Sequence, residues 1–153
     1  MALRPDRVEH LTDLSYFMNA TAERGILVVH DGGGSGAAMD DSAATVKVPT
    51  AVTDQPAGLL LNDVVNIDLT RQHINYMQDE VQQGGKVLLL RRGTVVTDRI
   101  SGTPVIGEQA HFAIGVSGGL LTTASQSNAS DQVGRWLSTK DSDGYAKVEI
   151  NIV

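Results

Sequence analysis

The sequence predicts a mainly β fold, a small antiparallel β-barrel or β-tulip-like domain with an extended N-terminal arm. Three observations support this prediction. Short apolar runs alternate with turn signals at close intervals, which is typical of all-β sandwiches and barrels. The chain has 16 glycines but only 4% aromatic residues, a composition that favours many tight turns over a helical bundle. Its C-terminal residues alternate between apolar and polar side chains, as a half-buried antiparallel strand requires.

Residues 1–45 are expected to form the arm, a short strand and a glycine-rich loop, and residues 46–153 the β-domain. Apolar residues in the first 24 positions recur at helical spacing, so this segment is either a short amphipathic helix or a partly ordered arm; they are Val8, Leu11, Leu14, Phe17 and Met18. The apolar run Gly25–His30 predicts a buried strand. Asp31–Ala44 is rich in Gly, Ala, Ser and Asp, which predicts a surface loop or linker.

From Val46 onward, turn residues separate a series of short strands. The predicted strands are Val46–Val48, Leu59–Leu61, Val64–Leu69, Lys86–Arg92, Thr94–Thr97, Ala110–Gly115 and Leu120–Thr123. Gly93 is expected to separate the fourth of these strands from the fifth. The segment Leu69–Gln83 remains open between helix and extended chain, because its apolar residues share a helical face while its Asn, His and β-branched residues lower helix propensity.

The strongest local signal is the C-terminal pair of runs, Val133–Thr139 and Tyr145–Val153. In the second run every alternate residue from Ala146 to Ile152 is apolar, and the other face carries Tyr145, Lys147, Glu149 and Asn151. Asp143-Gly144 supplies the positive-φ position that a tight turn needs. These features predict an antiparallel hairpin that buries one face.

Composition and charge exclude several functions. The 153 residues carry a formal net charge of -6, which argues against non-specific binding to nucleic acid or anionic membrane. Without cysteine there is no disulfide, thiol nucleophile or thiolate metal site. The longest aliphatic runs, Ile26–Val29 and Val87–Leu90, are far too short to span a membrane.

Two glycine-rich segments match the residue pattern of a catalytic or cofactor-binding motif, but the sequence around them lacks the features that such a motif requires. Gly32–Ala37 fits the dinucleotide-binding pattern G-x-G-x-x-A, but the residues that follow make a poor crossover helix, which favours a flexible loop. Gly115–Gly119 fits the nucleophile pattern G-x-S-x-G around Ser117. That pattern needs a later His, and no His follows His111, so a glycine-rich β-turn is the better interpretation.

The remaining polar motifs also favour structural roles. Asp141-x-Asp143-Gly144 matches part of a calcium loop, but its flanks are strand-like, so a solvated hairpin turn is expected. The four histidines lack metal-ligand spacing. Trp136 lies between apolar neighbours and is expected in the core more than at an interface. We therefore expect no catalytic residues, no cofactor and no metal, and the residues alone predict an assembly or binding module.

The stretch from about Asp63 to the C-terminus resembles the capsid decoration proteins, also called cement or head-stabilising proteins, of tailed bacteriophages. The segments that carry the resemblance are VVNIDLTRQHINYMQDEVQQGGKVLLLRRGTVVTD, SGTPVIGEQAHFAIGVSGGLLTTA and QVGRWLSTKDSDGYAKVEI. Each is a pattern of strands and turns, and their order carries the likeness. The N-terminal 24 residues and the Asp31–Ala44 segment lie outside it.

The resemblance implies a β-barrel or β-tulip domain that assembles as a homotrimer on the outer capsid of a virion, after synthesis in the host cytoplasm. Its partner would be the major capsid protein, whose subunit contacts it would stabilise without chemistry, nucleic acid or membrane. Residues expected to contact a partner are Leu3, Val8, Leu11, Leu14 and Phe17, with Tyr76 and Trp136 at or near a subunit interface. Alternatives are a head–tail connector or tail structural protein, a carbohydrate- or host-binding virion domain, and a small hydrolase built on Ser117.

Overall fold

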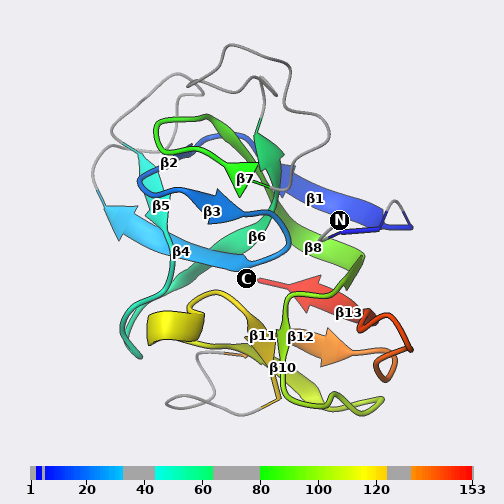
Figure 1. The fold of residues 1–153 in the computed structure, drawn as a ribbon. Helices are drawn as coiled ribbons and strands as arrows, with labels where there is room; N and C mark the ends of the chain where they lie inside the picture. The colour runs from blue at the N-terminus through cyan, green and yellow to red at the C-terminus, as the bar shows by residue number, and fades with distance from the viewer. Residues whose placement is uncertain (1–2, 5, 33–43, 64–79, 124–131, 153) are drawn as a thin grey trace.

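The computed structural model describes residues 3–4, 6–32, 44–63, 80–123 and 132–152, and these residues form a mainly β structure, as predicted (Figure 1). The strands are β1 (Val8–Asp13), β2 (Phe17–Met18), β3 (Ala22–Glu23), β4 (Leu27–Gly32), β5 (Thr45–Lys47), β6 (Pro56–Asp63), β7 (Glu80–Val81), β8 (Val87–Thr97), β9 (Ile100–Ser101), β10 (Gln109–Phe112), β11 (Leu121–Thr122), β12 (Gln132–Trp136) and β13 (Ala146–Asn151). A 3-10 helix, η1 (Gly115–Ser117), lies between β10 and β11. In this part of the chain, no helix is long and apolar enough to cross a membrane.

Most of these strands belong to a single mixed sheet. Within the described residues it has 11 strands in the order β2-β5-β4-β6-β8-β13-β12-β10-β11-β9, with β1 paired to β8 beside this path. The pairs β2–β5 and β9–β11 are parallel, and the other pairs are antiparallel. Strands β3 and β7 form a separate two-stranded ribbon. The predicted division at residue 45 stays a prediction; strands from both sides of it, such as β4 and β6, pair directly.

The sheet does not close into a barrel, which corrects the predicted architecture. Its terminal strands β2 and β9 are only two residues long. The chain around β2 contacts the residues that lead into β8 through the isolated bridge Phe17 to Lys86 and neighbouring backbone hydrogen bonds, such as Met18 N to the Gly85 carbonyl, but these do not extend into a strand ladder. Short edge strands offer few free backbone groups for further pairing, so the described sheet stays open.

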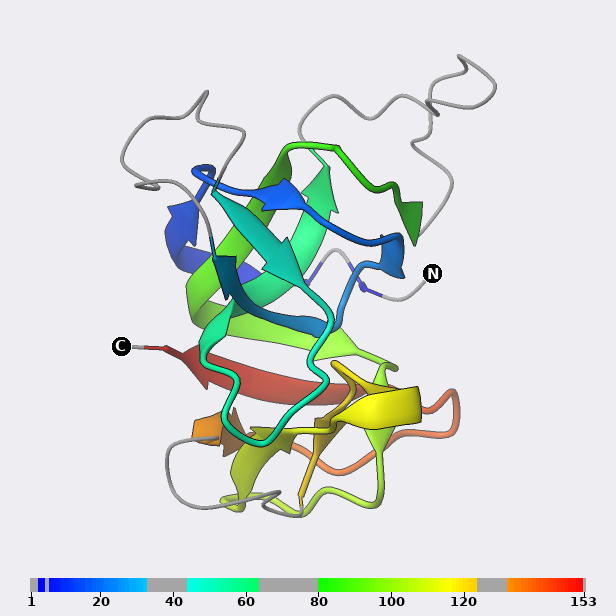
Figure 2. The ribbon, with the colours of Figure 1, turned by 90° about the vertical axis from the view of Figure 1, so that its left-hand side faces the viewer.

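Strand β8 joins the two halves of the sheet. Its first residues, Val87–Leu90, pair with β6, and its last residues, Arg92–Thr97, pair with β13. In Figure 2, β8 turns from the upper group of strands into the lower group. The expected break at Gly93 is therefore wrong. Gly93 has φ +151°, an uncommon backbone angle that glycine tolerates, and it continues the strand by pairing with both Glu9 and Ile150.

Val8–Asp13 of the N-terminal segment forms strand β1, which corrects the helical interpretation; the partly ordered arm stays a prediction. Residues Val8–Asp13 pair with Leu89–Thr94 of β8, and Leu3 bridges to Thr97 at the end of the same strand. Shifts in register on either side of Leu11 break the simple strand alternation. The apolar spacing that looks helical arises here from a bulged strand, because each extra residue changes which side chains share a face.

Two clusters of buried side chains fill the interior. The larger one lies mainly around β8, β13, β12 and β10 and consists of Leu3, Leu27, Val29, Leu59, Leu61, Leu90, Val95, Ile100, Ala110, Phe112, Leu121, Val133, Trp136, Ala146, Val148, Ile150 and Ile152. The smaller one consists of Met18, Ala22, Ile26, Val28, Val46, Ala57, Leu60, Val81, Val87 and Leu89. Successive residues of β4 and β6 enter different clusters, as strand geometry dictates.

The C-terminal hairpin confirms the predicted alternation. Ala146, Val148, Ile150 and Ile152 are buried, whereas Glu149 and Asn151 are exposed. Strand β12 pairs with β13 in antiparallel register, with Trp136 opposite Val148. Gly144 has φ +85° in the turn, as expected for its position after Asp143.

Candidate interaction surfaces

The predicted contact residues fall into four groups: exposed, half-buried, buried in the core, and outside the described residues. Val8 and Leu11 are exposed on β1, with 48% and 47% of their surfaces accessible. Leu14 and Phe17 are half-buried. The contact role of these four residues stays a prediction. Tyr76 lies outside the described residues, as does most of the ambiguous segment Leu69–Gln83, of which Glu80–Val81 forms strand β7.

Leu3 and Trp136 are placed in the core of their own chain. Leu3 is 2% exposed and Trp136 is completely buried. The position of Trp136 confirms the core interpretation made from its neighbours. Leu3 would reach a partner only if the N-terminal segment left β8; its contact with a partner stays a prediction, as does the place of Trp136 at or near a subunit interface. An apolar residue near the N-terminus carries no signal of whether its own sheet or another chain buries it.

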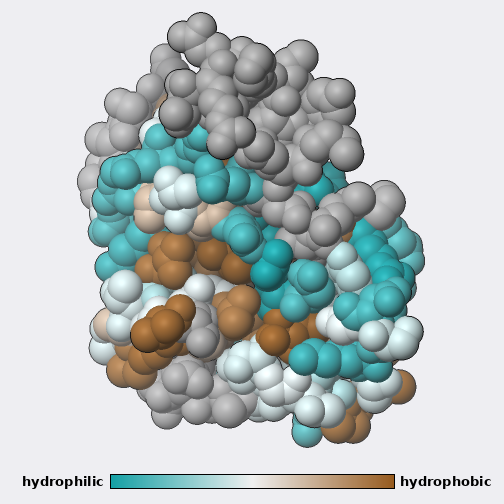
Figure 3. Space-filling view, in the orientation of Figure 1, coloured by the Kyte–Doolittle hydropathy of each residue, from teal (hydrophilic) through white to brown (hydrophobic). Residues whose placement is uncertain are grey.

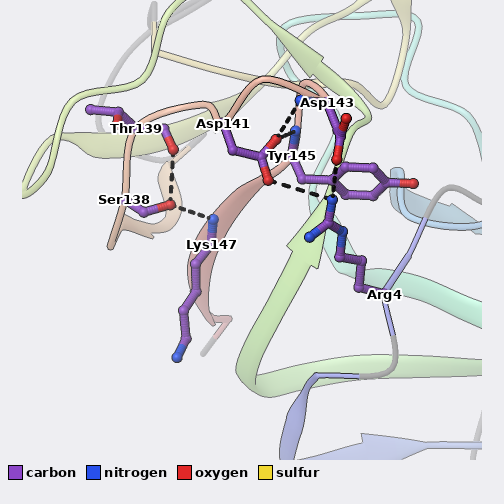
Figure 4. A network of polar contacts seen from close by, with 7 residues as sticks. All are labelled: Arg4, Ser138, Thr139, Asp141, Asp143, Tyr145 and Lys147. Carbon is purple, nitrogen blue, oxygen red and sulfur yellow. Dashed lines mark hydrogen bonds and ion pairs between the residues drawn. The ribbon is translucent and has the colours of Figure 1, made fainter.

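A polar clamp holds the N-terminal segment to the C-terminal hairpin (Figure 4). Arg4 Nη2 lies 3.1 Å from Asp143 Oδ2 and 3.4 Å from Asp141 Oδ2. The guanidinium also stacks on the Tyr145 ring, 4.2 Å from its centroid. The backbone amide of Arg4 donates to the carbonyl of Val96 on β8. Leu3 and Arg4 therefore anchor the segment ahead of the exposed β1 residues.

The hairpin turn beneath this clamp is built around Asp141. Its Oδ1 atom accepts hydrogen bonds from the amides of Asp143 and Tyr145, both at 2.9 Å. The bond from the Tyr145 amide contributes most to lowering the pKa of Asp141 below its ordinary value, against a smaller opposing effect of desolvation; the Asp143 amide and Arg4 lower it further. The expectation of a hairpin turn in place of a calcium loop is confirmed by the flanking strands β12 and β13.

A shallow apolar hollow lies between β3 and η1. It has a volume of ≈ 340 Å³, and its apolar lining includes Ile26, Val48 and Leu120. Charged residues Glu23, Glu80 and Arg99 also line it, and Arg99 Nη2 lies 2.7 Å from Glu23 Oε2. Figure 3 shows apolar atoms left of centre, over the region of β4 and η1, with hydrophilic surface above them. We call this feature the Ile26 hollow.

An apolar turn connects β9 to β10. In Val105–Glu108, here called the Ile106 turn, Val105 is 51% and Ile106 68% exposed, and Leu137 beside them is 36% exposed. Figure 3 shows apolar atoms at the lower right, where the loop between β9 and β10 ends. The sequence analysis missed this surface, although two adjacent β-branched residues before Gly107 at a turn are an unusual signal.

Hydrogen bonds fix the Ile106 turn in place. The Glu108 amide donates to the Val105 carbonyl at 3.2 Å, and the Val105 amide donates to Glu108 Oε2 at 3.3 Å. The Gly107 amide donates to the carbonyl of Trp136, and the Trp136 amide donates to the carbonyl of Glu108, both at 2.9 Å. The turn is thus tied to the fully buried Trp136, and its apolar side chains are presented on a rigid base.

The structure describes the backbone of one of the two glycine-rich motifs, Gly115–Gly119, in full. Gly115–Ser117 forms η1 between two paired strands, which confirms the turn interpretation over a strand-to-helix elbow. Most of the Gly32–Ala37 motif lies outside the described residues. Within the described part of the chain, no group of three or more His, Asp or Glu side chains is placed to hold a metal ion.

The open, mixed β-sheet defines a fold shared with a known virus component. The chain is similar in structure to a chain of "The capsid of Myoviridae Phage XM1", with a TM-score of 0.52 and 15% sequence identity. The match covers 94% of this chain and 84% of that chain. No family model and no curated protein matches the sequence. At this identity the likeness establishes the fold.

Proposed function

We propose that this chain is a structural protein of a tailed-phage virion that binds the outer capsid surface and stabilises contacts between major capsid protein subunits. In this proposal it acts as a homotrimer, uses no cofactor and catalyses no reaction. The observation that carries the proposal is the fold shared with a chain of the XM1 capsid over 94% of this chain. The resemblance of the sequence from Asp63 onward to decoration proteins supports the same role.

The exposed side of β1 is the surface we assign to capsid contact. Val8 and Leu11 expose apolar side chains from a strand whose position is fixed by Leu3 and Arg4. A strand at the edge of a sheet can accept an extended segment of another chain through backbone hydrogen bonds, while its side chains give specificity. Many weak contacts repeated over a capsid lattice suffice for stable attachment when the bound units are linked.

The copy number of the chain in purified virions tests the proposal. Quantitative mass spectrometry compares copies of this chain with copies of the major capsid protein. We expect a large fixed ratio, as a protein that covers the lattice requires. A handful of copies per virion would favour a connector or tail protein, and complete absence would refute a virion role.

A surface variant tests the assigned contact. Replacing Val8→Asp and Leu11→Asp together places charges on β1 without touching the core, and we expect the bound copies per capsid to fall at least about tenfold. The control for an added surface charge is Val52→Asp, since Val52 is similarly exposed at 41% but lies between β5 and β6, away from β1 in the sequence. Equal binding of the two variants would exclude β1 as the contact surface.

The absence of catalysis is tested by covalent labelling. A serine-directed phosphonate probe, followed by mass spectrometry, reports whether any serine is activated. We expect no adduct at Ser117, because the sequence has no His after His111 to act as its base. Selective labelling of Ser117 would overturn this part of the proposal and support a hydrolase.

A further inference from the structure

A polar groove crosses four neighbouring strands of the sheet. Two adjoining hollows of ≈ 350 Å³ and ≈ 470 Å³ share Glu149 and Asn151 of β13. The first hollow also reaches Arg135 of β12, and the second reaches Arg92 of β8 and His10 of β1. Figure 1 shows these strands one below another, from β1 to β12. We call the combined feature the β13 groove.

The pairing of the strands determines which side chains share the face that carries the groove. Glu149 lies opposite Arg135 on one side and opposite Thr94 on the other. Thr94 in turn lies opposite Val8 of β1, which is 48% exposed. Residues directly opposite each other in an antiparallel pair have their side chains on the same face. The β13 groove is therefore continuous with the exposed apolar side of β1, the surface assigned above to capsid contact.

The β13 groove presents positive charge that the described part of the chain does not neutralise. Arg92, Arg135 and Glu149 are exposed, and none of them forms an ion pair or a side-chain hydrogen bond with another described residue. Glu9 of β1 is already paired with Arg7, at 2.7 Å. Two guanidinium groups and one carboxylate are thus available to a ligand, on a chain whose net charge is -6.

The chemistry of these side chains indicates what the groove binds. A guanidinium favours a carboxylate, because its planar N–H groups can donate two parallel hydrogen bonds to the two oxygens. We propose that the β13 groove binds an extended segment of the capsid partner that carries two carboxylates, one at Arg92 and one at Arg135, and that continues over β1 with apolar residues. This inference rests on the proposed function, because it names the chemistry of the segment that contacts β1.

The spacing of the strands sets the spacing of the two carboxylates. Arg92 and Arg135 lie on β8 and β12, which are separated by β13. Two gaps between strands amount to about 10 Å, and an extended chain rises about 3.3 Å per residue. The carboxylates should therefore be about three residues apart. Apolar residues ahead of the first carboxylate would then reach Val8 and Leu11.

Other polar ligands fit the β13 groove less well. Among the described residues that line it, there is no Phe, Tyr or Trp side chain on which a base or a sugar ring could stack. Glu149 lies on the strand between the two arginines and repels a run of phosphates, as does the net charge of the chain. A peptide segment can place its carboxylates at the arginines and a neutral group at Glu149.

A pair of matched peptides tests the inference on the isolated chain. The probe is a capped peptide of sequence Leu-Leu-Glu-Ser-Ser-Glu, and its control carries Gln in place of both Glu residues. NMR titration of the isotopically labelled chain measures the affinity and locates the bound peptide. We expect the probe to shift amide signals of β8, β12 and β13. The control peptide should bind about 20-fold more weakly, because it lacks both carboxylates.

Two variants of the groove test which side chains hold the probe. Arg92→Gln and Arg135→Gln should each weaken binding about fivefold, the effect of losing one exposed ion pair. Lys140→Gln is the matched control, because it removes one exposed positive charge from the turn between β12 and β13, outside the lining of the groove. It should change the affinity less than about twofold. Circular dichroism of each variant confirms that the fold is retained.

Several outcomes would overturn the inference. Equal binding of the two peptides would do so, as would arginine variants that bind the probe like Lys140→Gln. Binding of oligogalacturonate in place of the probe would assign the groove to an acidic saccharide instead. Copies of the chain per virion are measured separately. A chain that is present in virions but does not bind the probe would refute this inference alone. Probe binding by a chain that is absent from virions would refute the proposed function and the capsid as the source of the segment.

Discussion

The C-terminal hairpin and the N-terminal segment lie against the same strand, β8, but their structures are specified differently. The hairpin β12–β13 is encoded locally, by a turn around Asp141 and Gly144 and by strict alternation in β13. The N-terminal strand β1 is bulged and pairs with residues far along the chain. The comparison shows that a strand can be predicted from sequence when its turn and its partner strand are close in the chain. A strand whose partner is distant in the chain is not predicted in this way.

Trp136→Ala should lower the free energy of unfolding the most, because Trp136 packs in the core cluster to which both regions contribute side chains. Trp136 is completely buried and packs in the larger cluster together with Leu3 and Ile150. Removing a buried aromatic side chain leaves a cavity, so the free energy of unfolding should fall by about 3–5 kcal/mol. Urea denaturation measures this change. Leu137→Ala, at a partly exposed neighbour, should cost less than about 1 kcal/mol; similar losses would contradict the assignment of the core.

Gly93→Ala should destabilise the N-terminal strand β1 more than the C-terminal hairpin. A Cβ atom at Gly93 would overlap the carbonyl oxygen of Val8, and φ is +151° there. We expect a loss of about 2–3 kcal/mol and faster hydrogen exchange in β1 than in β13.

The matched control for that substitution is Gly144→Ala. Gly144 also has positive φ but has nothing within 4 Å of an added Cβ, so its substitution should cost only about 1 kcal/mol. A uniform increase of exchange in both strands of the Gly93 variant would show that β1 does not open as a separate unit.

Arg4→Ala should have a smaller effect that is confined to the N-terminal segment. The substitution removes the ion pairs to Asp141 and Asp143 and the contact with Tyr145, all at a partly exposed site. Such contacts together contribute less than about 1 kcal/mol. Arg7→Ala is the control, because Arg7 pairs with Glu9 inside the same segment. Hydrogen exchange of β1 should increase only for Arg4→Ala, and an equal response to both would exclude the clamp.

The smallest expected effect is a decrease in the stability of the hairpin at acidic pH. The pKa of Asp141 is lower in the folded chain than its ordinary value of 3.8. Its contribution to stability is therefore complete above that value and is lost as the pH falls through the folded pKa. Urea midpoints of the wild type and Asp141→Asn, compared from neutral pH down to about pH 2, should approach each other as the pH falls below 3.8. A constant difference would mean that the charge of Asp141 plays no part.

Asp54 must be separated from this acid effect. Burial raises the pKa of Asp54, but hydrogen bonds from the amides of Thr50 and Ala51, together with the nearby Lys47, lower it overall. Its stabilising contribution also disappears as the pH falls, by the same sign argument. The acid dependence that remains in the Asp141→Asn variant therefore includes the contribution of Asp54.

Local sequence predicted the mainly β class, the buried strand in Gly25–His30 and the C-terminal hairpin, because these depend on alternation and turn residues within a short stretch. Among the exposed apolar side chains, it selected Val8 and Leu11 as contact residues, a role that stays a prediction, and it did not select the Ile106 turn. The turn was missed because whether Val105 and Ile106 are buried or exposed depends on their attachment to Trp136, about 30 residues later in the chain. Exposure depends on what packs nearby, which sequence spacing does not report.

The sequence by itself determined the strands whose turn and partner are close in the chain, such as β12 and β13, since period-two alternation and glycine turns restrict the backbone locally. The tertiary structure decided which strands pair, that Gly93 continues β8, and that Leu3 lies in the core of its own chain. It also decided that the sheet stays open. The physical reason is that pairing between distant strands depends on the total burial they achieve together, to which each segment contributes only a part.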